Sequence, residues 1–293
     1  MRFGTMFSGG EGVGVGLTAA GLHHVWGIEY DAAIAAVAQR NGFAVMVADV
    51  RQVDYAALPA VDWLHASPVC TRASVANSGA VESQEDIDTA AAVVRALKAQ
   101  EPQVFTLENV WQYRTFKAFT TITDALGHMG YFWTYDHVNA ADFGVPQTRR
   151  RLILRASRGL LPWLPEPVPW VGWYAAIEDL IPTLPESKLA PWQFTRMTGE
   201  LSRTVLINQT NTMEIREAWE PAAVQVSSSR TNRQRAVFPD ANRVVQMTTR
   251  CLARFQSVPD AYELPAKREL AARVIGNMVP PLVMQRIAEG MTA

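Results

Sequence analysis

Short apolar runs alternate with longer mixed stretches through the first 155 residues. Apolar runs of about four to eight residues bounded by turn residues are typical of buried strands, and longer stretches with helical spacing are typical of helices. Strands are predicted over 2–7, 25–29, 44–47, 61–64, 104–107, 132–138 and 151–155. Helices are predicted over 14–20, over an alanine-rich stretch that ends at 40, and over 86–98. This alternation favours a doubly wound α/β sheet that the last two strands close as an antiparallel pair.

The pattern changes at residue 160. Prolines and tryptophans are concentrated between 160 and 191, which indicates an irregular segment in place of another strand–helix unit. Residues 192–240 are polar, rich in Arg, Thr, Ser and Asn, and weakly periodic. Helical spacing resumes over 243–255, 267–274 and 281–289. We therefore expect three parts, 1–159, 160–242 and 243–293, of which the last returns to complete the first.

Length and composition narrow the class of protein. A chain of 293 residues, 48% of them hydrophobic, can bury a full α/β core beside a smaller lobe, which excludes disordered and collagen-like proteins. No apolar run approaches the ~18 residues that span a bilayer, and no signal peptide opens the chain, so no membrane association is expected. Two cysteines and five scattered histidines predict neither disulfides nor a metal site, and they favour a reducing cytoplasm.

The net charge of −1 hides an asymmetry along the chain. Residues 1–146 carry 8 Lys/Arg against 15 Asp/Glu, a balance of −7, whereas residues 187–254 carry 10 against 5, a balance of +5. A basic segment joined to an acidic one indicates that one face of the protein meets a polyanion. On charge alone, a merely solvated surface is the alternative.

Two reactive side chains follow predicted strands. Cys70 lies in a polar segment after the strand at 61–64, and Glu108 ends the strand at 104–107. The carboxyl ends of strands in an open α/β sheet face one crevice, so the thiol and the carboxyl group are expected to lie together. A thiolate is a soft nucleophile, and a carboxyl group beside it can hydrogen-bond or protonate a ring nitrogen. The pair predicts covalent attack on a pyrimidine.

Other strand ends predict a nucleoside site. A glycine-rich turn at 7–16 follows the first strand, where glycines let the backbone approach a ligand. Glu29 ends the second strand and can bind ribose hydroxyls, Tyr30 can stack on a purine, and Asp49 after the third strand can accept from an adenine amino group. Each acid alone is more often an ordinary loop residue, but Glu29, Tyr30 and Asp49 together, after successive strands, favour an adenosine site.

A basic cluster, Gln147-Thr148-Arg149-Arg150-Arg151, follows a Gly-Val-Pro turn. Its guanidinium groups can clamp a phosphate or position a carboxylate, and a solvated strand start is the alternative. Cys251 lies in a stretch with helical spacing and is interpreted as a buried small hydrophobic residue without a chemical role. The tryptophans around 163–192 are interpreted as packing residues.

These motifs, in this order, resemble those of the C5-cytosine DNA methyltransferases over nearly the whole chain. The turn at 7–12 is similar to the AdoMet loop of that family, and 29–31 and 49–50 are similar to its next cofactor contacts. Cys70 falls on the Pro-Cys nucleophile and 108–110 on the Glu-Asn-Val motif.

The later motifs extend the resemblance toward the C-terminus. Gln147, Arg149 and Arg151 match the family's Gln-x-Arg-x-Arg, and 254–259 and 276–277 match the segment after its recognition region and its Gly-Asn motif. Three departures stand out. Val69 and Thr71 flank the nucleophile where the family has proline and glutamine, although Pro68 remains. Glu11 replaces a loop glycine, so its side chain is expected to point out of the turn, and Met278 and 280–281 differ from the residues usual after Gly-Asn.

The resemblance implies a fold and an activity. The fold is a Rossmann-like class I methyltransferase sheet, mostly parallel with one antiparallel strand, with a small irregular target-recognition lobe. The implied parts are an AdoMet-binding catalytic domain over 1–159, the lobe over 160–242, and the returning segment over 243–293. The implied reaction is methyl transfer from S-adenosyl-L-methionine (AdoMet) to C5 of a cytosine flipped out of double-stranded DNA, through a bond between Cys70 and C6.

The resemblance also assigns residues. The catalytic residues that it implies are Cys70, Glu108, Arg149 and Arg151. The residues that it implies for AdoMet binding are Phe7, Ser8, Gly9, Gly12, Glu29, Tyr30, Asp49, Val50, Asn277 and Val279. The residues expected to contact DNA are Ser74, Gln147, Arg230, Arg233 and Arg235, the arginines because of the basic segment in which they lie. A monomer in the cytoplasm of a bacterial or phage-infected cell, without a metal, is expected.

Two alternative functions stay open. One keeps the chemistry and changes the substrate to RNA, as in the related tRNA-methylating branch, and activity on tRNA would favour it. The other is a catalytically impaired DNA-binding homologue, suggested by Val69 and Thr71, and duplex binding without methyl transfer would favour that one.

Overall fold

A computed structural model describes residues 1–68, 81–191, 193, 203–208, 214–228 and 234–292. The chain divides into two compact units. The first unit comprises Met1–Asn139, Arg150–Glu166 and Val283–Ala293, and the second comprises Ala140–Arg149 and Pro167–Leu282. Each unit has its own sheet, so the two are described separately.

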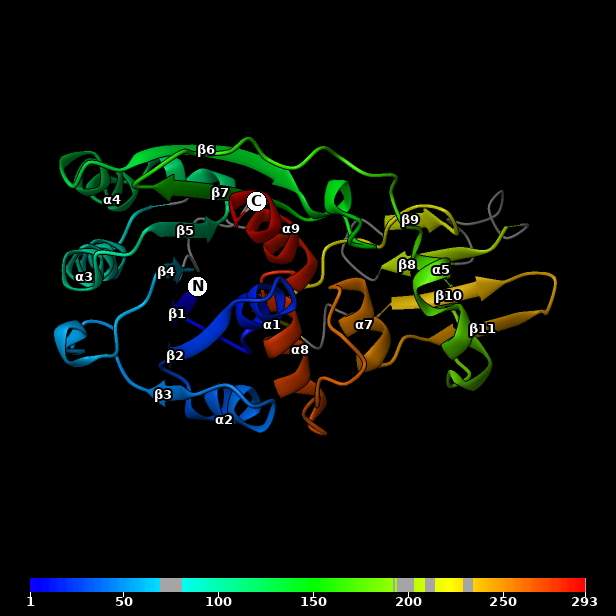
Figure 1. Cartoon of the computed structure of the whole chain (residues 1–293). Coiled ribbons are helices and arrows are strands. Elements are labelled where there is room, and N and C mark those ends of the chain that lie inside the picture. Colours follow the sequence, from blue (N-terminus) through cyan, green and yellow to red (C-terminus); the bar gives the residue numbers. More distant parts are fainter. Residues whose placement is uncertain (69–80, 192, 194–202, 209–213, 229–233, 293) are drawn as a thin grey trace. The chain divides into compact units, whose positions relative to one another are not determined.

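The first unit is built on a seven-stranded sheet (Figure 1). Its strands are β1 (Arg2–Met6), β2 (His23–Glu29), β3 (Val45–Val47), β4 (Trp63–Ala66), β5 (Val104–Asn109), β6 (Phe132–Asn139) and β7 (Arg150–Ser157). They lie in the order β3-β2-β1-β4-β5-β7-β6. The pairs from β3 to β5 are parallel, and β7 is antiparallel to both neighbours. The predicted mostly parallel sheet with one antiparallel strand is confirmed.

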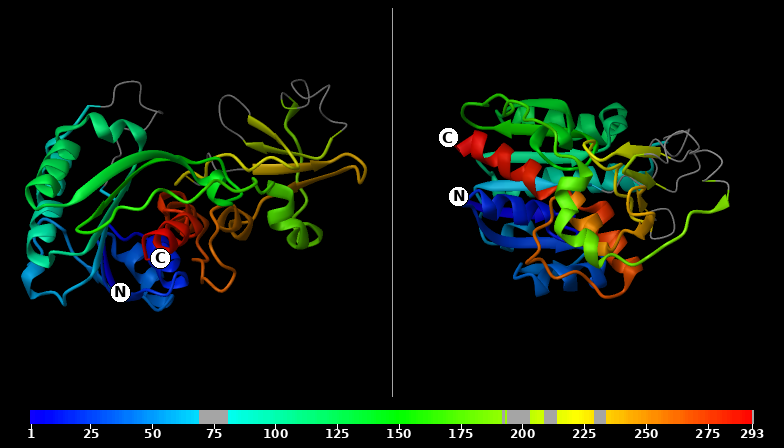
Figure 2. Two further views of the ribbon diagram at one scale, coloured as in Figure 1. Left: turned by 45° about the horizontal axis from the view of Figure 1, so that its top comes forward. Right: turned by 90° about the vertical axis from the view of Figure 1, so that its right-hand side faces the viewer.

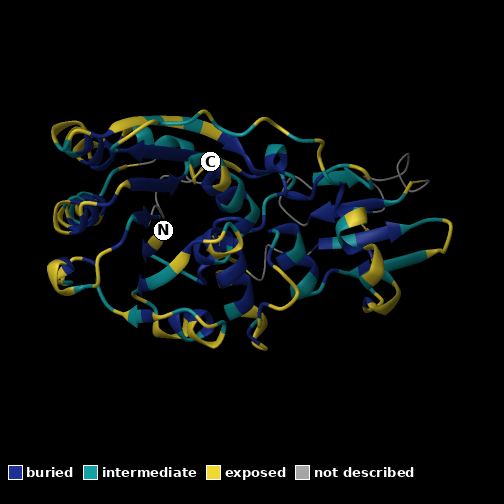
Figure 3. Cartoon of the chain, in the orientation of Figure 1, coloured by how far each residue is buried: buried dark blue, intermediate teal, exposed yellow. Residues whose placement is uncertain are grey.

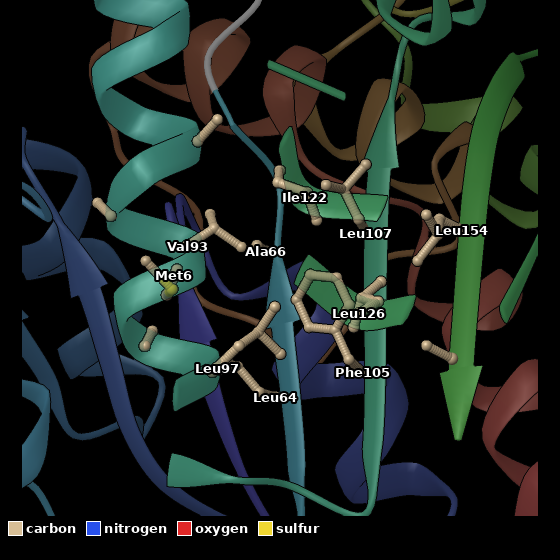
Figure 4. Close-up of a cluster of buried hydrophobic side chains, with 14 of the residues drawn as sticks. Met6, Leu64, Ala66, Val93, Leu97, Phe105, Leu107, Ile122, Leu126 and Leu154 are labelled. Carbon is tan, nitrogen blue, oxygen red and sulfur yellow. The ribbon is translucent and has the colours of Figure 1, made fainter. Parts of the chain in front are cut away.

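Helices α3 (Gln84–Gln100) and α4 (Lys117–His128) lie side by side against one face of this sheet (Figures 1 and 2). α3 begins at a capping box in which Ser83 and Asp86 satisfy each other's backbone N–H groups. Apolar side chains from both helices meet apolar side chains from the strands (Figure 4). The residues labelled there are Met6, Leu64, Ala66, Val93, Leu97, Phe105, Leu107, Ile122, Leu126 and Leu154. This face is the main apolar core of the unit.

The opposite face of the same sheet carries polar side chains at its centre. Side chains alternate between the two faces of a strand, so the residues next to those core positions point the other way. Thr5, His65, Thr106 and Arg155 are direct partners across β1, β4, β5 and β7, and each is at most 2% exposed. These four residues are called the polar row below. Figure 3 shows the central strands that carry them as buried.

The remaining elements of the first unit lie around this sheet. They are α1 (Gly12–Ala19), α2 (Ala32–Arg40), α9 (Pro281–Thr292), and the short 3₁₀ helices η1 (Tyr55–Ala57) and η2 (Trp111–Thr115). α9 begins in the second unit and belongs to the first from Val283 onward. No helix in the described part of the chain is long and apolar enough to cross a membrane.

The second unit contains a four-stranded antiparallel sheet, which corrects the expectation of an irregular lobe. Its strands are β8 (Val205–Asn208), β9 (Glu214–Glu217), β10 (Gln234–Phe238) and β11 (Arg243–Gln246), in the order β11-β10-β8-β9. Its helical elements are η3 (Ala140–Phe143), α5 (Trp173–Ile177), η4 (Glu178–Thr183), α7 (Thr249–Phe255) and α8 (Arg268–Asn277). A small cluster formed by Leu189, Val205, Ile207 and Val237 supports the sheet.

The helix predicted over 243–255 is wrong in its first half. Residues Arg243–Gln246 form β11 and pair with β10, from Phe238 opposite Arg243 to Arg235 opposite Gln246. The two adjacent valines in β11 favour a strand because β-branched side chains fit a pleated surface. The helix α7 begins only after Thr248, whose hydroxyl accepts from the backbone N–H of Cys251 as an N-cap.

Candidate active site

Most of the predicted site residues in the first unit follow the carboxyl ends of neighbouring parallel strands. The 7–12 turn follows β1, Glu29 ends β2, Asp49 follows β3, and Glu108 lies near the end of β5. Parallel strands present their carboxyl ends at one edge of a sheet, where ligands bind in open α/β folds. The described residues among the predicted cofactor and catalytic residues of this unit therefore share one edge.

The glycine-rich turn is held in place by the carboxylate of Glu29. Gly9 N donates to Glu29 Oε2 at 2.9 Å, and Asp31 N donates to Glu29 Oε1 at 2.8 Å. Phe7, Gly9 and Glu11 have positive φ values of 56°, 54° and 58°, so the turn uses the left-handed region three times. The carboxylate predicted to bind ribose thus already fixes the turn to the end of β2, and its remaining lone pairs stay available to a ligand.

Glu11 turns away from the loop and into the interior of the unit. It is fully buried, Thr5 Oγ1 donates to its Oε1 at 2.5 Å, and His24 Nε2 lies 3.3 Å from the same oxygen. A Cβ atom at Gly27 would lie 2.2 Å from Oε1, and one at Gly14 would lie 2.5 Å from Oε2. The carboxylate therefore occupies space that two glycines leave free, and it links the turn to the polar row.

The end of β3 carries a charged pair and a buried carbonyl. Arg51 Nη2 donates to Asp49 Oδ2 at 2.6 Å, and this hydrogen bond lowers the pKa of the Asp49 carboxyl group. Val50 is buried, and its carbonyl accepts from the hydroxyl of Tyr55 at 2.7 Å. Tyr30 is 75% exposed, so its ring is free to stack on a ligand.

Glu108 is buried at the same edge and faces a guanidinium group. The register of β5 and β7 pairs Glu108 with Ile153, so Arg151, two residues before Ile153 in β7, lies on the same face as Glu108. Arg151 Nε lies 3.1 Å from Glu108 Oε1. This contact is an ion pair without hydrogen-bond alignment, because Oε1 accepts no hydrogen bond from the described residues. A buried, charge-paired carboxylate with a free lone pair can accept a hydrogen bond from a ligand.

Asn109 connects this carboxylate to the segment before Cys70. Its Nδ2 donates to the carbonyl of Pro68 at 3.0 Å, and its Oδ1 accepts from Val110 N at 2.8 Å. These hydrogen bonds connect the end of β5 to Pro68, which lies two residues after the end of β4. Cys70 itself lies outside the described residues, as do Ser74, Arg230 and Arg233.

The predicted site residues of the second unit are mostly engaged inside that unit. Gln147 is fully buried; its Oε1 accepts from Gln225 N at 2.7 Å and its Nε2 donates to the Phe255 carbonyl at 3.2 Å. Arg149 is also buried, and its Nη1 donates to the carbonyls of Gln225 at 3.3 Å and Gly276 at 3.1 Å. These side chains brace the interior of the second unit.

Three other predicted residues of this unit lie in its described part, and they differ in their surroundings. Arg235 on β10 donates through Nε to Ser187 Oγ at 2.8 Å. Asn277 ends α8 and is exposed, whereas Val279 is buried. Gly276 packs so closely that a Cβ atom there would lie 2.3 Å from the backbone N of Ser227. The Gly-Asn motif thus needs its glycine for close backbone packing.

Sequence reasoning missed the polar row. Thr5, His65 and Thr106 lie in short strands whose other residues are mostly apolar, so their pattern is that of strands buried on both faces. The signal that was present is the alternation within β4, where His65 lies between Leu64 and Ala66. Among the described residues, no group of three potential metal ligands lies together.

Comparisons with known proteins agree with this geometry. The profile of the C-5 cytosine-specific DNA methylase family matches residues 1–293. The type II methyltransferase M.HaeII of Haemophilus aegyptius is 26% identical over 98% of this chain and 91% of its own length. The type II methyltransferase M.NlaX of Neisseria lactamica is 27% identical over 98% of this chain and 95% of its own.

Solved structures show the same fold. A putative DNA modification methyltransferase encoded within an E. coli prophage superposes with a TM-score of 0.74 at 16% identity, covering 100% of this chain and 98% of its own. A DNMT2 structure from Spodoptera frugiperda superposes with a TM-score of 0.71 at 13% identity, covering 100% of this chain and 99% of its own. With the family match over its full length, the chain belongs to the C-5 cytosine-specific DNA methylases and is a DNA (cytosine-5-)-methyltransferase.

Proposed function

We propose that this methyltransferase acts on a cytosine flipped out of duplex DNA, through a transient covalent bond from Cys70 to C6 of the base. The observation that carries the proposal is Glu108. Its carboxylate is buried, faces Arg151 at 3.1 Å, and keeps Oε1 free of hydrogen bonds from the described residues. A carboxyl group of this kind can bind N3 of a cytosine ring. Unstacking the base from the duplex costs about a few kcal/mol, and contacts such as this one in the pocket offset that cost.

The chemistry follows from the two side chains. Addition of the Cys70 thiolate to C6 places electron density on C5, and Glu108 stabilises the ring by hydrogen bonding or protonating N3. When bound, AdoMet would supply an electrophilic methyl group to C5, and its sulfonium would leave as a neutral thioether. Loss of the C5 proton to a base and departure of Cys70 then restore the aromatic ring. Arg151 keeps Glu108 oriented, and Asn109 holds the Pro68 carbonyl at 3.0 Å, two residues before Cys70.

Several residues of the first unit fit AdoMet. Ser8 Oγ is shielded from solvent and has no hydrogen-bond partner among the described residues, so it is available to a ligand. Gly9 and Gly12 let the backbone of the turn approach closely, Glu29 and Asp49 offer carboxylate oxygens, and the Tyr30 ring is exposed. Phe7 and Val50 would complete this side. Asn277 and Val279, for which the family resemblance also implies AdoMet binding, belong to the second unit.

We assign DNA recognition to the second unit, with 160–242 as the target-recognition lobe between the catalytic domain at 1–159 and the returning segment at 243–293. Arg230, Arg233 and Arg235 would contact phosphates or bases, and Ser74 would contact DNA from the first unit. Because Gln147 is fully buried, we assign it a bracing role in place of a direct contact. Arg149 would support Asn277 through its hydrogen bond to the neighbouring Gly276 carbonyl.

A trapping experiment tests the covalent mechanism. DNA that carries 5-fluorocytosine at the target should give a denaturation-resistant adduct, because fluorine at C5 cannot leave as a proton does. Peptide mapping should place the adduct on Cys70, and Cys70→Ser should abolish both adduct and turnover while AdoMet binding persists. Cys251→Ser, which removes the other thiol, is the matched control and should retain both. Turnover by Cys70→Ser, or an adduct on Cys251, would exclude the mechanism.

A further inference from the structure

His65 belongs to a buried chain of hydrogen bonds that leads along β4 toward the proposed active site. Trp63 Nε1 donates to Thr106 Oγ1 at 3.0 Å, Thr106 Oγ1 lies 2.8 Å from His65 Nδ1, and His65 Nε2 lies 2.8 Å from Ser67 Oγ. Trp63, His65 and Thr106 are at most 1% exposed, whereas Ser67 is half-buried. The chain thus begins in the core and ends at the edge where the site residues lie.

Only one direction of these hydrogen bonds gives every buried donor an acceptor. Burial lowers the pKa of His65 to about 3, so the ring is neutral near pH 7 and one nitrogen carries a proton. Indole N–H can only donate, so Thr106 Oγ1 accepts from Trp63. If the His65 proton were on Nδ1, the Thr106 hydroxyl would have no acceptor among the described residues, and an unsatisfied buried donor is costly.

The favoured arrangement therefore places the His65 proton on Nε2. The Thr106 hydroxyl then donates to Nδ1, and Nε2–H donates to Ser67 Oγ. Since Ser67 Oγ accepts from the ring, its own proton points elsewhere. No described residue accepts a hydrogen bond from this hydroxyl, so it is a directed donor at the end of β4.

Ser67 lies where both substrates of the proposed reaction meet. Its backbone N donates to the Met6 carbonyl at 3.3 Å, directly before the cofactor turn that begins at Phe7. Pro68, the next residue, is bound by Asn109 beside Glu108. β4 is the strand between β1 and β5, so the hydroxyl lies between the proposed AdoMet turn and the proposed base-binding carboxylate.

We propose that the Ser67 hydroxyl donates a hydrogen bond to an oxygen of a bound substrate, and that His65 is a positioning residue that fixes the direction of this donor. The inference rests on the proposed function above for the identity of the substrates. The acceptor is a carboxylate or carbonyl oxygen, either that of the methionine part of AdoMet or O2 of the target cytosine. Each has lone pairs that a serine hydroxyl can satisfy at this position.

Two measurements on Ser67→Ala distinguish the sources of the acceptor. If the acceptor is the AdoMet carboxylate, the calorimetric Kd for AdoMet without DNA should rise about tenfold, the loss typical of one such hydrogen bond. If the acceptor is the cytosine, AdoMet affinity should hold and the single-turnover rate of 5-fluorocytosine adduct formation should fall about tenfold. Thr123→Val removes another buried hydroxyl, which bonds the Thr120 carbonyl on α4, and should change neither quantity. An unchanged Kd and an unchanged adduct rate in Ser67→Ala would overturn the proposal.

The role of His65 is tested through coupling and through its tautomer. His65→Leu should reduce the same property as Ser67→Ala, either AdoMet affinity or the rate of adduct formation. In the Ser67→Ala background it should cause no further loss, because a positioning residue acts only through the group that it positions. A nitrogen-15 NMR spectrum should show His65 protonated at Nε2 alone and without titration from pH 5 to 9. Additive losses, or a proton on Nδ1, would refute the directed chain. The NMR and AdoMet-binding measurements do not depend on Cys70, so they stand even if the covalent mechanism fails.

Discussion

Gly27→Ala should destabilise the first unit because the new methyl group would collide with the buried carboxylate of Glu11. The Cβ atom would lie 2.2 Å from Glu11 Oε1, and 3.0 Å from both Thr5 Oγ1 and a Val45 methyl group. Glu11 can yield only by giving up its 2.5 Å hydrogen bond from Thr5. Overpacking of this kind costs about 1–3 kcal/mol, and losing a hydrogen bond to a charged group costs about 1.5–3 kcal/mol.

These contributions together lower the free energy of unfolding by about 3 kcal/mol. For a chain of this size, each kcal/mol shifts Tm by roughly 2–4 °C, so Tm should fall by roughly 6–12 °C in a thermal unfolding experiment. Because Glu11 is part of the glycine-rich turn, AdoMet affinity without DNA should fall as well. Gly127→Ala is the matched control: nothing lies within 4 Å of its added Cβ on α4, and it should stabilise the helix by about 0.5–1 kcal/mol.

The decisive comparison uses the background Glu11→Gly, in which the collision partner is absent. There the cost of Gly27→Ala should fall below about 1 kcal/mol, which gives a coupling of about 2 kcal/mol between the two positions. If Gly27→Ala is as stable as the wild type, or if its cost is the same in both backgrounds, the carboxylate does not fill the space beside Gly27 and the reasoning is refuted.

Three further outcomes are expected. Glu108→Gln should lower the rate of transfer on the order of a hundredfold or more while duplex affinity holds, since an amide cannot protonate N3; a normal rate with weakened AdoMet binding would assign Glu108 to the cofactor. Neutralising Arg230, Arg233 and Arg235 together should weaken duplex binding and reduce the log–log salt slope by about 0.9 per lost phosphate contact, whereas an unchanged slope would mean that these residues face solvent. Burial raises the pKa of the Cys251 thiol, so this group stays protonated at pH 8 and should resist thiol reagents in the native protein but react in guanidinium; rapid native labelling would contradict its burial.

The first unit was predictable because its elements are specified locally. Each parallel strand is a short apolar run with turn residues after it, and the amphipathic stretches between them are long enough for helices. The antiparallel closing pair followed from two adjacent strand patterns near 132–138 and 151–155. Acidic residues at strand ends marked the ligand-binding edge, because connectivity alone places those ends together.

The second unit was less predictable because its sheet depends on pairing between distant short strands. β8 and β10 are four and five residues long and pair across a gap of more than twenty residues, so neither shows a long periodic signal. The sequence of β11 is also compatible with a helix, and only its pairing with β10 identifies it as a strand. Gln147 shows the same limit for side chains: a polar residue in a basic cluster reads as exposed, yet three hydrogen bonds hold it in the interior.

The two faces of the seven-stranded sheet divide stability from function. The face toward α3 and α4 is apolar from Met6 to Leu154, which suits a core whose free energy comes from burial (Figure 4). The opposite face has a polar centre, and most buried polar groups in folded proteins are hydrogen-bonded. Glu108 and Arg151 lie on this second face, as do Thr5 and His65. Two separate sets of buried hydrogen bonds lie on this face: Thr5 with Glu11 holds the turn after β1, and Thr106 with His65 and Ser67 holds the end of β4. Residues whose sequence pattern shows only interior strand positions thereby fix the edge of the sheet where the described residues of the proposed site lie.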